Sequence, residues 1–202
     1  MKYAKPYDRA AALNAALFLF WERGFHATSI KDLEDALKMR SGSIYAAFKS
    51  KENLYALALE QYFQNSQNAF EKDVLEAQSP LAGLVAMIRR ISQADDILRR
   101  PCMLIKAVIN ATDDTAEIAG IARDYRKRMV ENMVQGFEKA RQLGELQSNS
   151  EPKALASQYQ TDVIGLQVEA QMGADTQHFA NRVEETARRY ERLQVMNLSG
   201  IS

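Results

Sequence analysis

The stretch ATSIKDLEDALKMRSGSIYAAFKSKENLY, residues 27–55, has the clearest structural pattern in the chain. It holds two short helical patterns joined by a tight connection at residues 38–40, and a third helix begins directly after them. In the first pattern, Ser29 or Thr28 is the expected N-cap, and apolar residues recur at the spacing of one helix face. These apolar residues are Ile30, Leu33, Ala36 and Leu37. The arrangement predicts a helix-turn-helix.

The second pattern predicts a short helix that Ser41 caps, in which Ile44 and Phe48 lie four residues apart and face inward. Its outer side then carries small and polar residues, which are Gly42, Ser43, Tyr45, Ala46 and Ala47. The major groove of DNA is roughly 12 Å wide and admits an α-helix. Because side chains that are short near the backbone allow close approach, we expect this outer side to enter the groove.

The charge around these helices favours the same function. No carboxylate stands between residues 38 and 51, whereas four basic residues do: Lys38, Arg40, Lys49 and Lys51. Ser50 is the expected N-cap of the next helix, whose N-terminal amides and Lys51 would form a phosphate site. Counterion release depends on the phosphates that a protein meets, so this cluster matters more than the balance of 26 basic and 26 acidic residues in the whole chain.

The segment from Leu13 to Tyr55 resembles the DNA-binding domain of the TetR family of bacterial transcriptional regulators. The words GF, TSI, DLEDAL, SIYAAF and SKENLY stand in that family's order and spacing, and RPCML at 100–104 resembles the GCLL-like segment of one branch. Two residues depart from the pattern, because Lys38 and Pro101 stand where glycine is usual. A non-glycine residue at positive φ costs on the order of 1 kcal/mol, so we expect the turn at Lys38 to be strained or differently shaped.

The resemblance implies a ligand-responsive transcriptional regulator, not an enzyme, and we take repression as its expected action. Such a protein binds a near-palindromic operator in double-stranded DNA as a homodimer and is released by a small-molecule effector; no cofactor or metal is implied. We assign phosphate contacts to Thr28, Lys49 and Lys51, and we expect Ser43 and Tyr45 to face the groove or to lie beside a phosphate. The full set of expected DNA contacts is Thr28, Arg40, Ser41, Gly42, Ser43, Tyr45, Ala46, Ala47, Lys49 and Lys51.

The rest of the chain predicts an all-α protein of about nine helices, because no alternating β pattern of useful length occurs. A first helix runs from Asp8 to Arg23 after a basic arm at 1–6, and a connecting helix runs from Ser50 as far as Phe70 or Leu75. The expected body helices are 81–98, 101–111, 115–143, 152–172 and 176–196. We therefore expect a helix-turn-helix domain at 1–52 and a helical effector-binding and dimerisation domain at 53–202.

The last two expected helices carry apolar stripes that allow two interpretations. The stripes could pair with those of a second copy as a four-helix bundle, or face only their own subunit. Periodicity does not separate these alternatives, and the resemblance favours dimerisation. The residues assigned to the dimer interface are Tyr159, Val163, Leu166, Phe179, Val183 and Tyr190.

The resemblance also implies an effector pocket among helices 81–98, 101–111 and 115–143. Methionine is flexible and polarizable, so it suits an adaptable apolar pocket, although such residues more often form ordinary core. The candidates for ligand binding are Met87, Ile91, Met103, Ala107, Met129 and Met133.

Catalytic chemistry has little support in this sequence. His26 and His178 are the only histidines and lie in no recognisable catalytic or metal-binding motif. The single cysteine, Cys102, excludes an internal disulfide and fits a reducing cytosol. Its thiol is either a reactive sensor beside Arg99 and Arg100 or a small buried hydrophobe.

No run of about 18 apolar residues occurs, so we expect no membrane-spanning helix and a cytoplasmic protein. Asp8, Arg9 and Asn14 interrupt the apolar run near the N-terminus, which predicts an amphipathic helix and not a signal peptide. The rival interpretation is a helical enzyme or protein-interaction module that keeps a helix-turn-helix shape without binding DNA.

Overall fold

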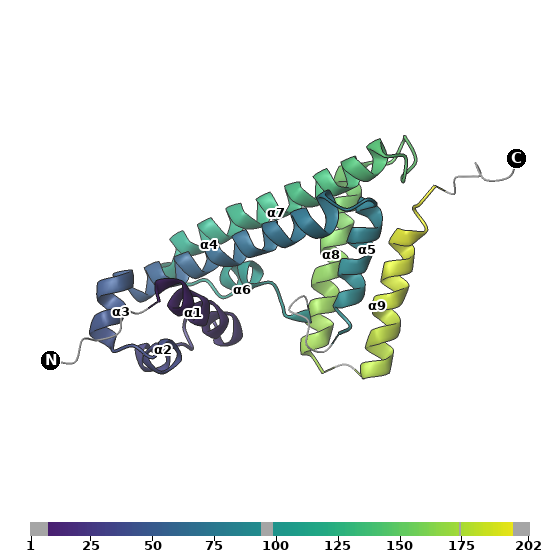
Figure 1. Cartoon of the computed structure of the whole chain (residues 1–202). Helices are drawn as coiled ribbons and strands as arrows, with labels where there is room; N and C mark the ends of the chain where they lie inside the picture. The colour runs from purple at the N-terminus through teal and green to yellow at the C-terminus, as the bar shows by residue number, and fades with distance from the viewer. Residues whose placement is uncertain (1–7, 94–98, 174, 196–202) are drawn as a thin grey trace, which may run out of the picture. The chain divides into compact units, whose positions relative to one another are not determined.

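The computed structural model describes residues 8–93, 99–173 and 175–195 (Figure 1). Across these ranges the chain forms nine α-helices and no strand, which confirms the all-α prediction. The basic arm expected at 1–6 and the last residues of the expected helix 81–98 lie outside the described residues. Within them, no helix has both the length and the apolar character needed to cross a membrane.

The chain forms two compact units, and each combines stretches that are distant in sequence. The first unit is Met1–Ser66 with Met103–Arg126, and the second is Gln67–Cys102 with Lys127–Ser202. These units are defined by how compactly their residues pack, whereas the predicted division into 1–52 and 53–202 concerns which residues bind DNA. That division stays a prediction.

The first two helices of the first unit begin and end where local sequence signals predict. α1 (Arg9–Arg23) begins after the N-cap Asp8, whose carboxylate accepts hydrogen bonds from the amides of Ala10 and Ala11 at 3.0 and 3.1 Å. It ends at Gly24, which has φ 83°. α2 (Ile30–Leu37) begins at Ser29, which forms a capping box with Asp32. Ala36 is exposed, so the inward face of α2 is narrower than the sequence pattern suggested.

Aromatic packing fills the core of the first unit. The ring of Tyr55, on α4 (Lys51–Phe70), lies 5.0 Å from that of Phe20 and 5.2 Å from that of Phe25, measured between centroids. Burial raises the pKa of Tyr55 to about 12. Two further elements, α6 (Met103–Ile109) and the start of α7 (Ala116–Gln142), add buried side chains to this unit. These are Met103, Leu104, Ala107, Ile118, Ala119 and Ala122.

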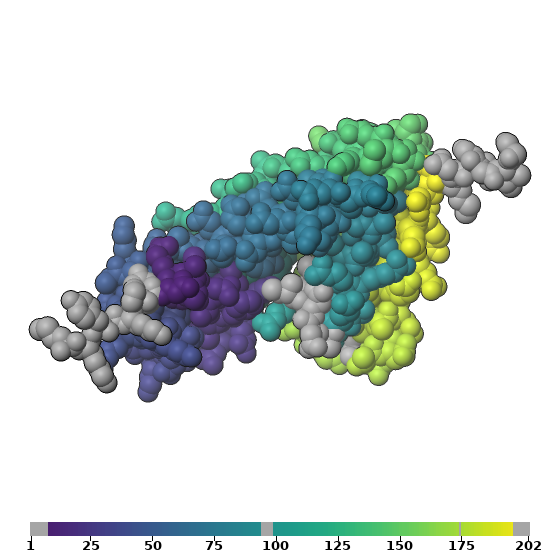
Figure 2. All heavy atoms as spheres, in the orientation of Figure 1, coloured from purple at the N-terminus to yellow at the C-terminus, as the bar shows by residue number. Residues whose placement is uncertain are grey.

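The second unit contains α5 (Pro80–Arg90), α8 (Pro152–Gln171), α9 (Thr176–Glu191) and the later part of α7. Its surface includes α9, drawn in yellow (Figure 2). Ser79 caps α5 and Pro80 opens it. However, the expected helix 81–98 is too long, because α5 ends at Arg90 and the chain turns at 91–93.

The apolar stripes of α8 and α9 form the core of the second unit. Five of the six side chains assigned to a dimer interface are at most 3% exposed within their own chain: Tyr159, Leu166, Phe179, Val183 and Tyr190. Val163 packs against the same core. The hydroxyl of Tyr159 also donates a hydrogen bond to the carbonyl of Leu84 on α5 at 2.8 Å. The assignment of these five residues to a subunit interface is therefore corrected, because their side chains face the core of their own subunit. Val163 is half-buried, and its assignment stays a prediction.

A π-helical segment, η1 (Glu71–Leu75), follows α4 directly and packs closely against α5. A Cβ atom added at Gly83 of α5 would lie 2.2 Å from the carbonyl oxygen of Asp73 and 3.1 Å from the Cα atom of Val74. Only glycine fits at position 83 without movement of the backbone.

Candidate nucleic-acid interface

α3 (Ser41–Phe48) presents the small and polar face that the sequence predicts. Ile44 and Phe48 are each 1% exposed and point into the first unit. On the opposite side Gly42, Ser43, Tyr45 and Ala46 are exposed and Ala47 is half-buried. Tyr45 is 46% exposed, so its ring and hydroxyl are available to a partner.

The N-terminus of α3 is capped from another helix and not by its own serine. Arg40 is the N-cap residue and makes no side-chain capping bond, so the assignment of this role to Ser41 is wrong. Instead, the amide of Ser41 donates to the Glu34 carboxylate of α2 at 2.5 Å. A carboxylate here also interacts favourably with the positive end of the helix dipole. The contact ties α2 to α3 across the turn, and capping signals in sequence are too local to reveal it.

The turn between α2 and α3 contains a strained lysine. Lys38 adopts the left-handed conformation, with φ 53° and ψ 39°, and its amide donates to the carbonyl of Glu34. The strained alternative is therefore correct, and the turn keeps the conformation that glycine would adopt more easily. The side chain of Lys38 is exposed.

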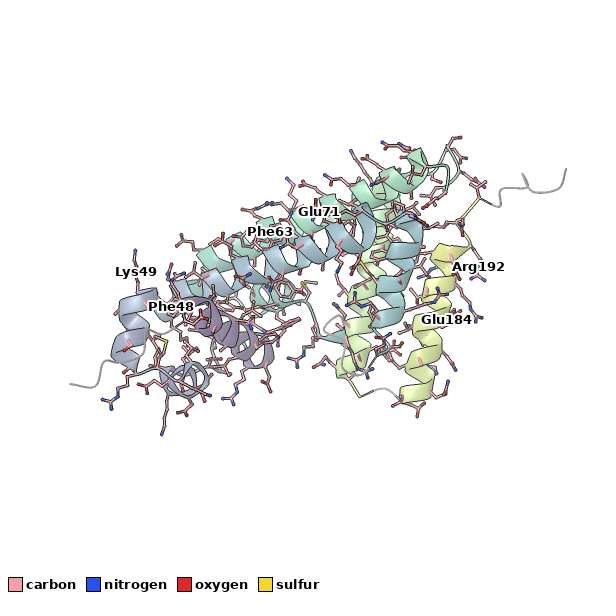
Figure 3. The ribbon with its side chains drawn as sticks, viewed as in Figure 1. Phe48, Lys49, Phe63, Glu71, Glu184 and Arg192 are labelled. Atoms are coloured by element: carbon pink, nitrogen blue, oxygen red, sulfur yellow. The ribbon has the colours of Figure 1, made fainter. Side chains whose placement is uncertain are left out.

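A second strained lysine lies just after α3. Lys49 has φ 68° and ψ −54°, and the amide of Ser50 donates to the carbonyl of Phe48 at 2.8 Å. These features define a γ-turn of positive φ, a rare and strained conformation. Figure 3 shows the buried ring of Phe48 and the exposed side chain of Lys49. Ser50 then caps α4 through the amide of Asn53 at 3.0 Å, as expected.

Two of the expected phosphate contacts are engaged within the first unit. Thr28 is 0% exposed, and its hydroxyl donates to the carbonyl of Gly24 at 2.7 Å, so its side chain is not available to DNA. The ammonium of Lys51 donates to the carbonyl of Thr28 at 2.8 Å and lies 4.2 Å from the centroid of the Phe25 ring. An ammonium has three N–H donors, so Lys51 keeps donors for a phosphate. The assignment of Thr28 as a phosphate contact is therefore corrected.

The candidate ligand-binding residues belong to different units. Met103 and Ala107 are buried in the first unit. Ile91 and Met133 belong to the core of the second unit, with Met87 packed against that core. Met129 is half-buried. The expected role of these six residues in binding an effector stays a prediction, as do the two alternatives for Cys102, which is half-buried.

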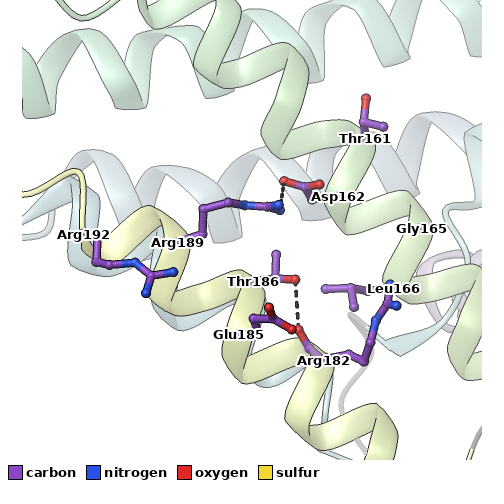
Figure 4. Close-up of a pocket in the computed structure, with 9 residues that line it drawn as sticks. All are labelled: Thr161, Asp162, Gly165, Leu166, Arg182, Glu185, Thr186, Arg189 and Arg192. Carbon is purple, nitrogen blue, oxygen red and sulfur yellow. Dashed lines mark hydrogen bonds and ion pairs between the residues drawn. The ribbon is translucent and has the colours of Figure 1, made fainter.

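A polar groove of about 370 Å³ lies between α8 and α9 in the second unit (Figure 4). Its lining residues are Thr161, Asp162, Gly165, Leu166, Arg182, Glu185, Thr186, Arg189 and Arg192. Asp162 pairs with Arg189 at 2.6 Å and accepts a hydrogen bond from the Tyr190 hydroxyl at 2.6 Å. The pKa of Tyr190 is raised, first by burial and then by this hydrogen bond. The sequence pattern did not predict this groove, because its lining residues come from two helices and helical periodicity describes one helix at a time.

No group of three or more His, Cys, Asp or Glu side chains gathers as a metal site would require, as far as the described ranges extend. His26 lies in the loop between α1 and α2, and its ring is 5.2 Å from that of Phe25. His178 donates its amide to the N-cap residue Asp175 at the start of α9.

Comparison with known proteins agrees with this geometry. Residues 12–58 match the family described as bacterial regulatory proteins, tetR family. Over 194 residues the chain is 28% identical to the HTH-type transcriptional repressor ComR of Escherichia coli strain K12, which covers 94% of this chain and 91% of ComR. The chain also resembles a solved structure of CifR, a TetR family transcriptional regulator, in which a cysteine mutant is bound to 26-base-pair double-strand operator DNA. This CifR chain is 25% identical in sequence to the present chain and superposes on it with a TM-score of 0.79. That superposition covers 92% of this chain and 98% of the CifR chain.

The strain at Lys38 predicts a stabilising substitution. Lys38→Gly should raise the free energy of unfolding by about 0.5–1 kcal/mol, because relief of the left-handed strain, roughly 1–2 kcal/mol, exceeds the entropic cost of glycine. Lys38→Ala is the matched control, since it removes the same charge and keeps the strain. Urea unfolding of the three proteins measures the difference. If Lys38→Gly proved no more stable than Lys38→Ala, the turn would carry no strain.

Proposed function

Because the chain belongs to the TetR family of bacterial regulatory proteins, we propose that it is a cytoplasmic, DNA-binding transcriptional repressor that a small-molecule effector releases from its operator. The observation that carries the proposal is α3, which exposes small and polar side chains on one face. Exposed cations stand at both of its ends, Lys38 and Arg40 before it and Lys49 after it. A helix of this kind flanked by positive charge suits the major groove and the phosphates beside it.

The residues of α3 divide into base-reading and phosphate-binding groups in this proposal. Ser43 and Tyr45 reach the base edges, since both are exposed and carry hydroxyls that donate and accept hydrogen bonds. Ala46 is small enough to allow close approach and to meet a thymine methyl group. Arg40 and Lys49 bind phosphates on either side of the groove, which positions the helix without selecting a sequence.

The N-terminus of α4 supplies a further phosphate site. Its first amides point out of the helix, and Ser50 already satisfies that of Asn53. Lys51 stands at the first position of α4 and holds the carbonyl of Thr28 with one of its three N–H groups. We propose that the other two donate to a phosphate of the same strand that Lys49 contacts. Residues 1–52 thus form the DNA-binding part of the chain.

We further propose a homodimer that places two copies of α3 in successive major grooves, about 34–36 Å apart. Since the apolar stripes of α8 and α9 are buried in their own chain, the surface offered to a second copy is the one they leave exposed. It consists of the groove between these helices and two exposed apolar side chains. Val168 lies on α8 and is 48% exposed, and Met172 directly follows α8 and is 81% exposed. A two-fold axis through this surface would bring the same patch of both copies together.

Effector release requires differential binding. An effector that favours a spacing of the two α3 helices unsuited to the operator lowers the affinity for DNA, and operator DNA lowers the affinity for that effector by the same factor. The rival interpretation as a helical enzyme is disfavoured, because the relatives named above are transcriptional regulators.

Selection of genomic fragments from the source organism by the purified protein tests the function. At about 150 mM salt we expect recovery of a near-palindrome, bound by two copies of the chain about a thousandfold more tightly than unrelated DNA. Sedimentation of the complex measures the stoichiometry. Recovery of nothing above background would refute the DNA-binding function.

Lys49 and Lys51 should behave as phosphate contacts. Lys49→Ala and Lys51→Ala should each weaken binding to every duplex and reduce the slope of log K against log salt by about 0.9, because one fewer counterion is released. The matched control is Lys127→Ala, which removes an exposed lysine from α7. If a variant instead lost affinity for one base pair only, that lysine would be a base-reading residue.

The proposed dimer surface predicts the effect of a charge in the groove. Gly165 is exposed on α8 and an added Cβ would meet no atom within 4 Å, so Gly165→Arg should fold normally and yet obstruct a second copy. Sedimentation should then show a monomer. Gln177→Arg, at an exposed site of α9 outside the groove, adds the same charge and should leave the dimer intact. A dimer that persisted in Gly165→Arg would place the interface elsewhere.

A further inference from the structure

The loop between α1 and α2, together with the end of α1, contacts residues of the later stretch of the first unit, Met103–Arg126. This loop, residues 24–29, leads from the C-cap Gly24 to the N-cap Ser29, where the helix-turn-helix begins. α6 and the start of α7 belong to the same compact unit as this loop. Their contacts with it involve side chains that the DNA-binding role does not use.

Lys106 of α6 contacts the end of α1. Its ammonium donates to the carbonyl of Trp21 at 2.5 Å and to that of Glu22 at 3.2 Å. The last carbonyls of a helix have no partners within the helix, and a cation at this end also interacts favourably with the helix dipole. The only basic residue of α1's own last turn, Arg23, is directed instead to Asp32 of α2, at 2.8 Å. The cation that caps the carbonyl end of α1 is therefore supplied from about 85 residues away in sequence.

Thr112, in the connection between α6 and α7, contacts the middle of the same loop. Its hydroxyl oxygen lies 3.0 Å from the Nε2 atom of His26 and donates its single proton to the Asp114 carboxylate. Since a hydroxyl has only one proton to donate, Nε2 of His26 is the donor in the contact with Thr112. The Thr112 hydroxyl also holds the pKa of Asp114 below its ordinary value.

The loop has one internal contact and one contact from α4 as well. The hydroxyl of Thr28 donates to the carbonyl of Gly24, and Lys51 donates to the carbonyl of Thr28. The residue next to Thr28 is the N-cap Ser29, so the position of the loop sets where α2 begins. α2 in turn caps α3 through Glu34. A continuous set of contacts thus runs from Lys106 through the end of α1 to the helix that faces DNA.

We propose that Lys106 is a positioning residue for DNA binding: its ammonium fixes the carbonyl end of α1 and with it the loop that starts the helix-turn-helix. This rests on the proposed function, because it assigns Lys106 an effect on operator affinity. Lys106 acts through Trp21 and Glu22 and does not touch DNA. It is half-buried, and its ammonium is bound to two carbonyls, whereas the proposed phosphate contacts Arg40 and Lys49 are exposed.

The test compares Lys106→Met and Lys106→Gln, which remove the charge, with Lys106→Arg, which keeps it. Lys127→Met is the matched control, because it removes an exposed lysine from α7. Two quantities are measured on the full chain: amide hydrogen exchange of residues 22–29 in the free protein, and affinity for the selected operator at several salt concentrations. Unfolding midpoints establish that each variant is folded.

In Lys106→Met we expect faster exchange at residues 22–29 and an operator affinity about five- to tenfold lower. The slope of log K against log salt should not change, because no phosphate contact is lost. Lys106→Arg should restore most of the affinity, Lys106→Gln should resemble Lys106→Met, and the control should match the unaltered protein. Should Lys106→Met not fold, Lys106→Gln provides the same comparison.

Three results would overturn the proposal. A salt slope reduced by about 0.9 would make Lys106 a phosphate contact. Unchanged exchange at residues 22–29 would show that the ammonium does not hold the loop. Faster exchange with unchanged affinity would show that the loop does not govern DNA binding. If the unaltered chain bound no duplex, the proposed function would fail, and with it the effect of Lys106 on DNA, while exchange would still report whether the ammonium holds the loop.

Discussion

Three buried aromatic rings set the geometry on which the DNA-binding unit depends. Tyr55 of α4 packs against both Phe20 of α1 and Phe25 of the following loop, and the two phenylalanine rings lie 6.3 Å apart. Contacts of this kind contribute about 0.5–1.5 kcal/mol each beyond the area that they bury. Because this cluster and the inward side chains Ile44 and Phe48 contribute to the core, the rest of α3 is free to be small and polar. The exposed face of α3 is thus a consequence of where the aromatic residues lie.

What could be predicted from the sequence is what depends on neighbouring residues. Asp8, Ser29 and Ser50 begin helices as expected, since capping involves amides within one turn. The faces of α3 were also predicted correctly, because helical periodicity is local. These features give the all-α fold and most of the candidate DNA-binding surface.

The features that sequence patterns missed join distant residues. Thr28 was expected to contact a phosphate because it is a polar loop residue, yet it is buried, and its hydroxyl donates a hydrogen bond to the carbonyl of Gly24. The stripes of α8 and α9 were assigned to a second copy, but α5 and α7 already cover them. Periodicity reports that a face is apolar and says nothing of what covers it. For the same reason, neither the Glu34 cap of α3 nor the contact of Lys106 with α1 was visible in advance.

The discontinuity of the first unit has a consequence for synthesis on the ribosome. Domains generally fold as the chain emerges, from the N-terminus onward at about 5–20 residues per second. Here the helix-turn-helix is complete by residue 48, but the unit that contains it also needs residues Met103–Arg126. The interval between emergence of residue 66 and residue 126 is therefore roughly 3–12 s at that rate. For about the first 2–8 s of this time the nascent DNA-binding unit lacks Lys106 and the apolar side chains of α6, so its core stays incomplete until the ribosome has released that segment.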